Sequence, residues 1–494
     1  MSGGVDVPDR EPPADGVLWG ATRVSLCPHA VTVRGRPEPP ATLARGVPSR
    51  RGVLIVAMAC AIATTTVRQG HATDGSLLES WLAQRTATGT WGGARDDLEQ
   101  RGVSIELSYA ADFAGNVSGG DRRGSGYAGF AVAGLGIDLE KLMSLHGAAL
   151  VMSGLWASGR DVTEEFIGNL FPVQETFAPG DVYLGQLALS QSLLGDTVTI
   201  QVGRLFAGDV FATSPLWNYY VSGGINANLA SIPTNIFFPV TQTTTWGARV
   251  FYQLTKEWGF IAGGYNTDPT VAAPSRHGVD FSLDMSKGAL AIAQVTYSHN
   301  QSRELTGLPG SVTLGGYSAR GTFPELDDPR RTERGNYGLY LYFDQMLYRG
   351  DWIEFAGPEH LRADASYALR SRHPYIHESA TPKDRAHGLT VWGAVYVAPR
   401  DTINPQMAQV AGGLLYHGMF PGRDHDVTAL GVINGIFSDR LSRQGTETVL
   451  EVNHRFQLTR WFYVTPDFQY VIHPNGFASV GNAAVFAGEL AIAF

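Results

Sequence analysis

The sequence predicts an all-β protein, a transmembrane antiparallel β-barrel of 16 strands with a short helical segment before the first strand. The first observation is that segments of alternating apolar and polar residues recur from residue 103 to residue 494. The second is that no window holds the roughly 18 to 20 apolar residues of a membrane helix, so only a closed barrel could cross a bilayer. The third is that the connections are short at one expected end of the barrel and long at the other.

The composition agrees with one large sheet of many strands. The 494 residues include 59 glycines, and charged residues make up only 17% of the chain, against roughly 25% in soluble domains. No break in composition divides the chain after residue 75. The formal net charge of −9 argues against nucleic acid as a partner.

The first 72 residues are interpreted as an N-terminal extension followed by a cleavable signal peptide. Residues 1–48 show no periodicity. Ser49, Arg50 and Arg51 then precede an apolar run at 53–67, and small residues near Ala72 offer a cleavage site. We therefore expect export across the inner membrane and insertion into a bacterial outer membrane.

The remaining chain divides into a short segment and the barrel. Residues 73–102 have helical character and are expected on the periplasmic side, whereas residues 103–494 form the predicted outer-membrane barrel. Cys27 and Cys60 both precede the expected cleavage site, so the mature chain would hold no cysteine and need no disulfide.

Period-two alternation defines each expected strand. In the last one, Phe486, Leu490 and Ile492 point to one side, while Ala487 and Glu489 point to the other. In a transmembrane barrel the apolar side faces lipid and the polar side faces the lumen. The predicted strands are 103–114, 127–139, 147–157, 181–191, 196–205, 245–255, 258–266, 279–286, 289–299, 337–348, 388–399, 407–418, 426–437, 446–458, 461–472 and 484–494.

The connections alternate between short and long if the first strand runs outward. The expected inner turns are 141–146, 193–196, 255–257, 286–288, 420–425 and 458–460, and the long outer loops are 158–180, 206–244 and 300–336. One segment departs from this rule, because 349–387 should be an inner turn and is long. It contains either a hidden pair of strands or a periplasmic excursion.

Several short motifs, in this order and spacing, resemble the carbohydrate-selective porins of the OprB family of Gram-negative bacteria. They are Thr90–Arg95 with Leu98 and Gly102, Gly115–Gly120, Gly168–Phe171, Gly203–Leu205 with Phe211 and Ala212, Asn336–Tyr340 with Asp344–Met346, Gly413–Gly418 followed by Phe420–Arg423 and Asp426, and Thr465–Tyr470 with His473 and Pro474. The resemblance implies a 16-stranded passive channel for small sugars, with no cofactor. The terminal aromatic Phe494 likewise resembles the signal that barrel-assembly machinery reads in this class.

Sugar transfer requires polar groups that replace water on hydroxyls, aromatic faces that stack on a pyranose ring, and binding weak enough to allow release. Arginine forks that face carboxylates suit vicinal hydroxyls. Strand parity places the following candidates on the lumen side: Arg249, Tyr340, Tyr342, Asp344, Glu451, Arg455, Asp467, Gln469, Glu106 and Asp112.

Two of the long outer loops, 158–180 and 206–244, are candidates for the constriction. They carry acids and aromatic residues that could form an eyelet if the loops fold inward, or a surface lid if they do not. The constriction candidates are Glu164, Glu165, Asp209, Trp217 and Tyr219. Arg204 falls on the lipid-facing parity of its strand, so we expect it above the membrane edge or after a bulge.

Other functions find less support in the sequence. A general diffusion porin for small or acidic solutes is the alternative within the same class, and a purely structural barrel would differ in having a plugged lumen. An outer-membrane hydrolase would need a nucleophile and a base, and we predict no catalytic residue. His373 and His377 are separated by Pro374, and Asp424, His425 and Asp426 lie in an expected turn, so no metal site is predicted.

Overall fold

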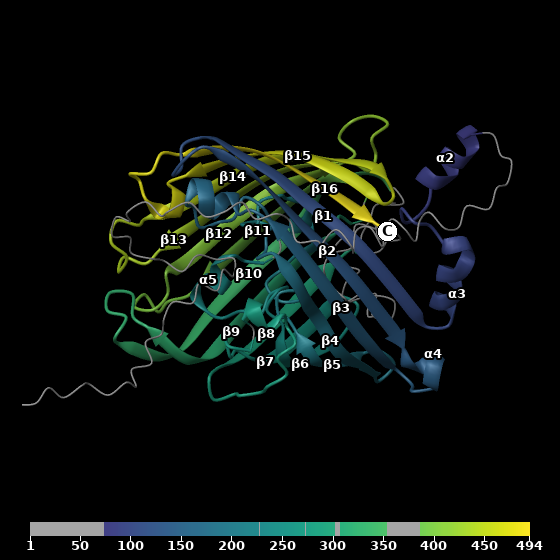
Figure 1. Cartoon of the computed structure of the whole chain (residues 1–494), viewed down its shortest axis with the longest axis horizontal. Helices are drawn as coiled ribbons and strands as arrows, with labels where there is room; N and C mark the ends of the chain where they lie inside the picture. The colour runs from purple at the N-terminus through teal and green to yellow at the C-terminus, as the bar shows by residue number, and fades with distance from the viewer. Residues whose placement is uncertain (1–73, 227, 272, 302–306, 353–385) are drawn as a thin grey trace, which may run out of the picture.

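Sixteen antiparallel strands close into one barrel (Figure 1), as predicted, with each strand paired to its sequence neighbours and β16 paired to β1. The computed structural model describes residues 74–494 except 227, 272, 302–306 and 353–385. The strands are β1 Val103–Ser118, β2 Gly124–Asp138, β3 Ala148–Gly159, β4 Asp181–Leu193, β5 Val198–Leu205, β6 Thr245–Gln253, β7 Trp258–Asn266, β8 Ala289–His299, β9 Gly310–Pro324, β10 Thr332–Trp352, β11 Ala386–Val397, β12 Gln406–His417, β13 Val427–Phe437, β14 Thr446–Thr459, β15 Phe462–Ile472 and β16 Ala483–Ala493.

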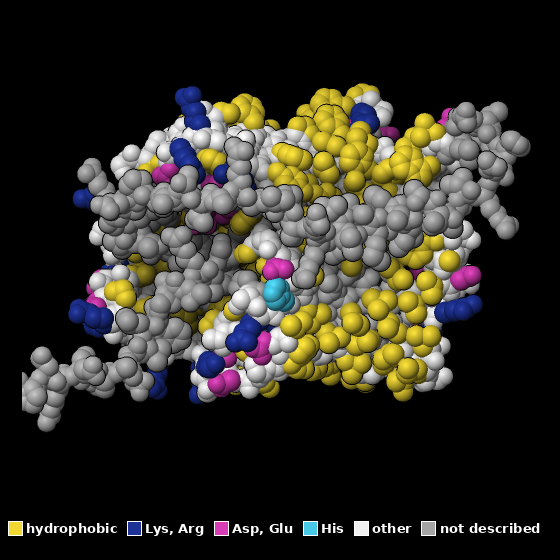
Figure 2. Space-filling model, viewed as in Figure 1, with side chains coloured by type: hydrophobic (Ala, Val, Ile, Leu, Met, Phe, Trp, Pro, Cys, Tyr) yellow, Lys and Arg dark blue, Asp and Glu magenta, His cyan; other side chains and the backbone are white. Residues whose placement is uncertain are grey.

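Side chains alternate between the two faces of the wall as the sequence predicts. On β16, Phe486 is exposed on the outer face, whereas Val485 and Glu489 are buried on the inner one. Phe486 packs against Phe468 of the neighbouring β15, with ring centroids 5.1 Å apart. Figure 2 shows the result as a broad apolar surface over the strands, which is the surface that a barrel presents to lipid.

Short helices lie at the loops and at the N-terminal end. They are α2 Asp74–Leu82, α3 Ala94–Gln100, α4 Leu139–Met143 and α5 Ser231–Asn235, with single turns at η1 Trp91–Gly93, η2 Thr163–Ile167, η3 Pro215–Tyr219, η4 Pro274–Arg276 and η6 Pro474–Gly476. Within the described ranges, no helix is long and apolar enough to cross a membrane.

The N-terminal segment contacts the end of the last strand. In Figure 1, α2, α3 and α4 lie at the same end of the barrel as the C-terminal residue. Arg95 donates hydrogen bonds to the main-chain oxygens of Phe494 (2.7 Å) and Gly89 (3.1 Å), and Ala87 N–H donates to Ala493 O (2.8 Å). The segment therefore covers the closing seam between β16 and β1, at the end where the turns are short.

Two strand predictions were wrong, and the errors compensate in the count. The segment 279–286 forms no strand, and β9 (Gly310–Pro324) lies where the sequence predicted only the outer loop 300–336. The inner face of β9 carries small or weakly polar residues such as Ser311, Gly315 and Ala319, so its alternation is faint. Residues 286–288 consequently belong to an outer loop rather than to an inner turn.

The ends of the long segment 349–387 belong to β10 and β11. These two strands pair directly with each other, for example Leu341 with Val395, so among the described residues no other strand lies between them in the barrel. Residues 353–385, which include His373 and His377, lie outside the described residues.

Candidate functional site

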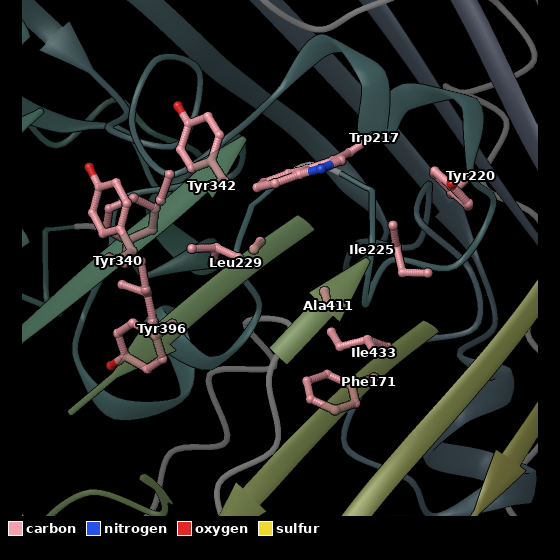
Figure 3. Close-up of a cluster of buried hydrophobic side chains, with 14 of the residues drawn as sticks. Phe171, Trp217, Tyr220, Ile225, Leu229, Tyr340, Tyr342, Tyr396, Ala411 and Ile433 are labelled. Carbon is pink, nitrogen blue, oxygen red and sulfur yellow. The ribbon is translucent and has the colours of Figure 1, made fainter. Parts of the chain in front are cut away.

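Two outer loops fold into the barrel, as the eyelet hypothesis expected. Residues 160–180 connect β3 to β4, and residues 206–244 connect β5 to β6; we call them loop A and loop B. Apolar side chains of both loops join the inward-facing side chains of the wall in one buried cluster, which Figure 3 shows in part. Phe171 of loop A and Tyr220 of loop B are both fully buried there.

Aromatic rings fix loop B against β10 and β11. The Trp217 ring lies 5.3 Å from the Tyr342 ring and 5.6 Å from the Trp392 ring, measured between centroids, and Figure 3 shows Trp217 beside Tyr342. Trp392 Nε1 donates to the Tyr220 hydroxyl (2.9 Å), which donates in turn to Leu430 O (2.8 Å). Tyr340 donates to Gln294 Oε1 (2.9 Å).

Two carboxylates on β14 bind the main chain of the loops. Glu447 accepts hydrogen bonds from Leu170 N–H (2.7 Å) and Phe171 N–H (2.8 Å) of loop A. Glu451 accepts from Val221 N–H (2.7 Å) and Ser222 N–H (3.3 Å) of loop B. The two carboxylates lie on the same face of β14, the inner one, because residues an even number of positions apart on a strand share a face. Each loop is thus held by an ionisable acceptor.

Two arginines hold loop B from other strands. Arg249 on β6 forms a bidentate ion pair with Asp209, with Nη1–Oδ1 and Nη2–Oδ2 distances of 2.5 and 2.8 Å, and both side chains are buried. Arg455 on β14 donates to Asn218 O (2.6 Å) and lies 3.3 Å from Glu489. The Arg455 guanidinium also stacks over the Tyr219 ring, 4.9 Å from its centroid.

Two further lumen-side candidates hold loop A, and a third supports one of them. Asp112 on β1 accepts from Thr176 N–H (2.9 Å). Gln469 on β15 donates to Val173 O (2.9 Å) and to Asp467 Oδ2 (2.8 Å). All three side chains are buried. Asp112 and Gln469 therefore contact loop A, and Asp467 contacts Gln469; contact of these residues with a sugar stays a prediction.

The comparisons with known proteins agree with this architecture. The family model of the carbohydrate-selective porin, OprB family, matches residues 122–494. The chain belongs to this family. Porin B of Pseudomonas aeruginosa is 25% identical over 430 residues, which cover 80% of this chain and 88% of that protein.

Two solved structures share the fold of this OprB-family chain. The high pH structure of Pseudomonas putida OprB has a TM-score of 0.70 at 21% identity, covering 83% of this chain and 99% of that one. The low pH structure of the same protein has a TM-score of 0.52 at 18% identity, with the same coverage. The predicted 16-stranded barrel, its place in the bacterial outer membrane and its function as a sugar porin are therefore confirmed.

Four of the predicted site residues remain accessible in this porin. Glu106 on β1 and Asp344 on β10 are half-buried, and Asp344 accepts a hydrogen bond from Ser311 Oγ (2.5 Å). Glu164 of loop A is exposed, and Glu165 pairs with Arg160. The other eleven predicted residues lie beneath the loops or within them.

One ionisable group of loop A is perturbed by its surroundings. Burial raises the pKa of Asp161 to about 6, because an ionised carboxylate loses hydration there. Asp161 also accepts a hydrogen bond from Glu164 N–H (3.1 Å) at the start of η2. The protonation of loop A therefore changes within the mildly acidic range.

Sequence reasoning missed several anchors of the loops, including Glu447 and Gln409. Glu447 lies on the same inward-facing side of β14 as Glu451, and this parity was the sequence signal that could have identified it. Gln409 on β12 accepts from Ser231 N–H (2.9 Å) of loop B, and no motif marked it. In the part of the chain that the structure describes, no group of three His, Cys, Asp or Glu residues could hold a metal ion.

Proposed function

We propose that this porin passes monosaccharides down their gradient through a constriction that loops A and B form inside the barrel. The observation that carries the proposal is that lumen-facing side chains of many different strands bind the main chain of these loops. They include Asp112 on β1, Arg249 on β6, Gln294 on β8, Gln409 on β12, Glu447, Glu451 and Arg455 on β14, and Gln469 on β15. A loop with so many fixed points holds one shape.

The predicted residues then divide into two groups by accessibility. Buried residues such as Arg249, Glu451 and Trp217 set the shape of the constriction. Accessible carboxylates, namely Glu106, Asp344, Glu164 and Glu165, accept hydrogen bonds from sugar hydroxyls as the solute passes. Passage requires no covalent step, so we propose no catalytic residue.

The proposed partners outside the lumen are lipid and the assembly machinery. The outer face of the wall is apolar, as contact with outer-membrane lipid requires. Phe494 follows the outward parity of β16, and its N–H donates to Leu107 O (2.8 Å) on β1. Recognition of Phe494 by barrel-assembly machinery would have to precede this pairing.

Sugar block of ion current through single channels in planar bilayers tests the proposal. We expect glucose to reduce the current of the wild-type channel, and Asp344→Asn to weaken that block because one accessible acceptor is lost. Asp284→Asn, outside the barrel, is the matched control and should block like the wild type. Conducting channels that no sugar blocks would overturn the selective constriction; equal block in Asp344→Asn would remove that residue from the path.

A further inference from the structure

An arginine lies on the lipid-facing side of the wall. Arg204 of β5 pairs in register with Leu187 of β4 and Trp246 of β6, and the register runs through it without interruption. It shares the outward parity of Ile200 and Val202. Of the two predicted alternatives, a place above the membrane edge or a bulge, the bulge is therefore absent from β5. A bare guanidinium at this position would face the lipid side of the wall, where charge is unfavourable.

A segment of the loop between β7 and β8 covers this arginine. We call residues 276–286 the strap. The guanidinium donates to Asp280 O (2.9 Å) and Gly278 O (3.3 Å) of the strap and to Thr244 O (2.6 Å), and Arg204 is fully buried. The strap thus supplies the acceptors that lipid could not.

Three further contacts fasten the strap to the outer face of the wall. Trp246 Nε1 on β6 donates to Phe281 O (2.8 Å). Leu184 N–H on β4 donates to His277 O (2.8 Å), and His277 Nδ1 lies 3.1 Å from Val182 O. The strap therefore crosses the lipid-facing side of β4, β5 and β6 near the ends that carry the long loops, whereas loops A and B fold into the barrel.

The strap carries an apolar row. Val279, Phe281, Leu283 and Met285 are between 46% and 60% exposed. The intervening polar residues bond locally, with Ser282 N–H donating to Asp280 Oδ1 (3.1 Å) and Ser286 N–H to Asp284 Oδ1 (2.9 Å). Four exposed apolar side chains in seven residues form a patch that water does not favour.

We propose that the strap is a lipid-contacting element, with its apolar row against the acyl chains of the outer leaflet and Arg204 as the positioning residue that holds it there. The row continues an established lipid-facing surface, since Val202 and Leu189 on the underlying strands are 49% and 51% exposed. The Phe281 ring lies 6.2 Å from the Trp246 ring. Aromatic residues near the ends of the strands, where Trp246 and Phe281 lie, are typical of the interfacial girdle of a barrel.

Site-directed spin labels in liposomes test this placement. In a chain with Cys27→Ser and Cys60→Ser, single labels are placed through Leu283→Cys, Val202→Cys on the wall, and Arg330→Cys on an exposed outer loop. Collisions with oxygen report lipid, and collisions with a water-soluble nickel chelate report water. We expect the oxygen and chelate collision rates of the label at 283 to equal those of the label at 202 within about twofold. The chelate collision rate at 283 should be at least about fivefold lower than that at 330.

Two outcomes would overturn the proposal. One is chelate access at 283 equal to that at 330. The other is dipolar broadening between labels at 283 that disappears on dilution with unlabelled protein, which would show that a second copy of the chain covers the row.

A variant tests the role of Arg204. Arg204→Met should let the chelate reach the label at 283 while the label at 202 stays shielded, because the strap carbonyls lose their donor and the strand pairing of the wall is unchanged. Trp246→Phe, which removes the hydrogen bond to Phe281 O but keeps an aromatic ring at this position, should have a smaller effect in a barrel that folds normally. Shielding at 283 that survives both substitutions would contradict the role assigned to Arg204.

Discussion

Replacing Glu451 by alanine should free loop B from the inner wall. Glu451→Ala removes the acceptor for the Val221 and Ser222 N–H groups, and both groups are buried. A buried donor left without a partner costs about 1–3 kcal/mol, so two cost about 2–6 kcal/mol. At about 1.4 kcal/mol per tenfold change, exchange protection of these two amides should fall by about 30-fold to about 10⁴-fold.

Hydrogen exchange followed by mass spectrometry on the folded barrel measures this loss. Glu447→Ala is the reciprocal variant, and in it the largest loss of exchange protection should occur at the Leu170 and Phe171 amides of loop A. Glu99→Gln, on α3 at the end of the barrel where the turns are short, is the control and should leave both loops protected. Unchanged protection at Val221 and Ser222 in Glu451→Ala would refute the claim that this carboxylate holds loop B.

Three further perturbations have defined outcomes. Arg249→Met leaves the buried Asp209 carboxylate unpaired and should lower the free energy of unfolding in urea by about 3–5 kcal/mol, most of which Arg249→Met with Asp209→Leu should restore; a stable single variant would contradict the pairing. The raised pKa of Asp161, about 6 against 3.8 when unfolded, means that the folded state binds its proton more tightly, so stability is lost as pH rises from about 4 to about 6. The urea midpoint of the wild type should therefore fall relative to Asp161→Asn between pH 4 and pH 7, and a constant difference would refute this sign. Arg95→Gln removes the charged donor to Phe494 O and should lower the temperature at which the folded barrel converts to the slowly migrating unfolded form on electrophoresis; an unchanged temperature would show that the seam needs no such clasp.

The sequence predicted the wall of the barrel well because the lipid-facing alternation is local. Glu451, Arg249 and Tyr342 could each be assigned to the lumen from the parity of their own strand. The strap shows where this reasoning stops. Residues 279–286 alternate as regularly as a strand, yet the alternation there reflects an extended segment with one apolar side, and no β-pairing follows from it.

The site was harder to predict because its contacts join residues far apart in the chain. The bond between Glu447 and Leu170 spans 277 residues, and no local pattern encodes it. A lumen-facing carboxylate looks the same in sequence whether it meets a solute or a loop amide. Only the inward path of loops A and B decides that Glu451 is buried and that Asp344 stays accessible.

Liposome swelling with the purified mature protein tests the sugar-selective constriction most directly. Glucose and arabinose are compared with neutral amino acids of matched size and with disaccharides. The account predicts that the two monosaccharides enter clearly faster than amino acids of equal size, and that disaccharides enter more slowly. Rates that follow solute size alone would contradict a constriction built for sugars, and absence of swelling would contradict an open channel.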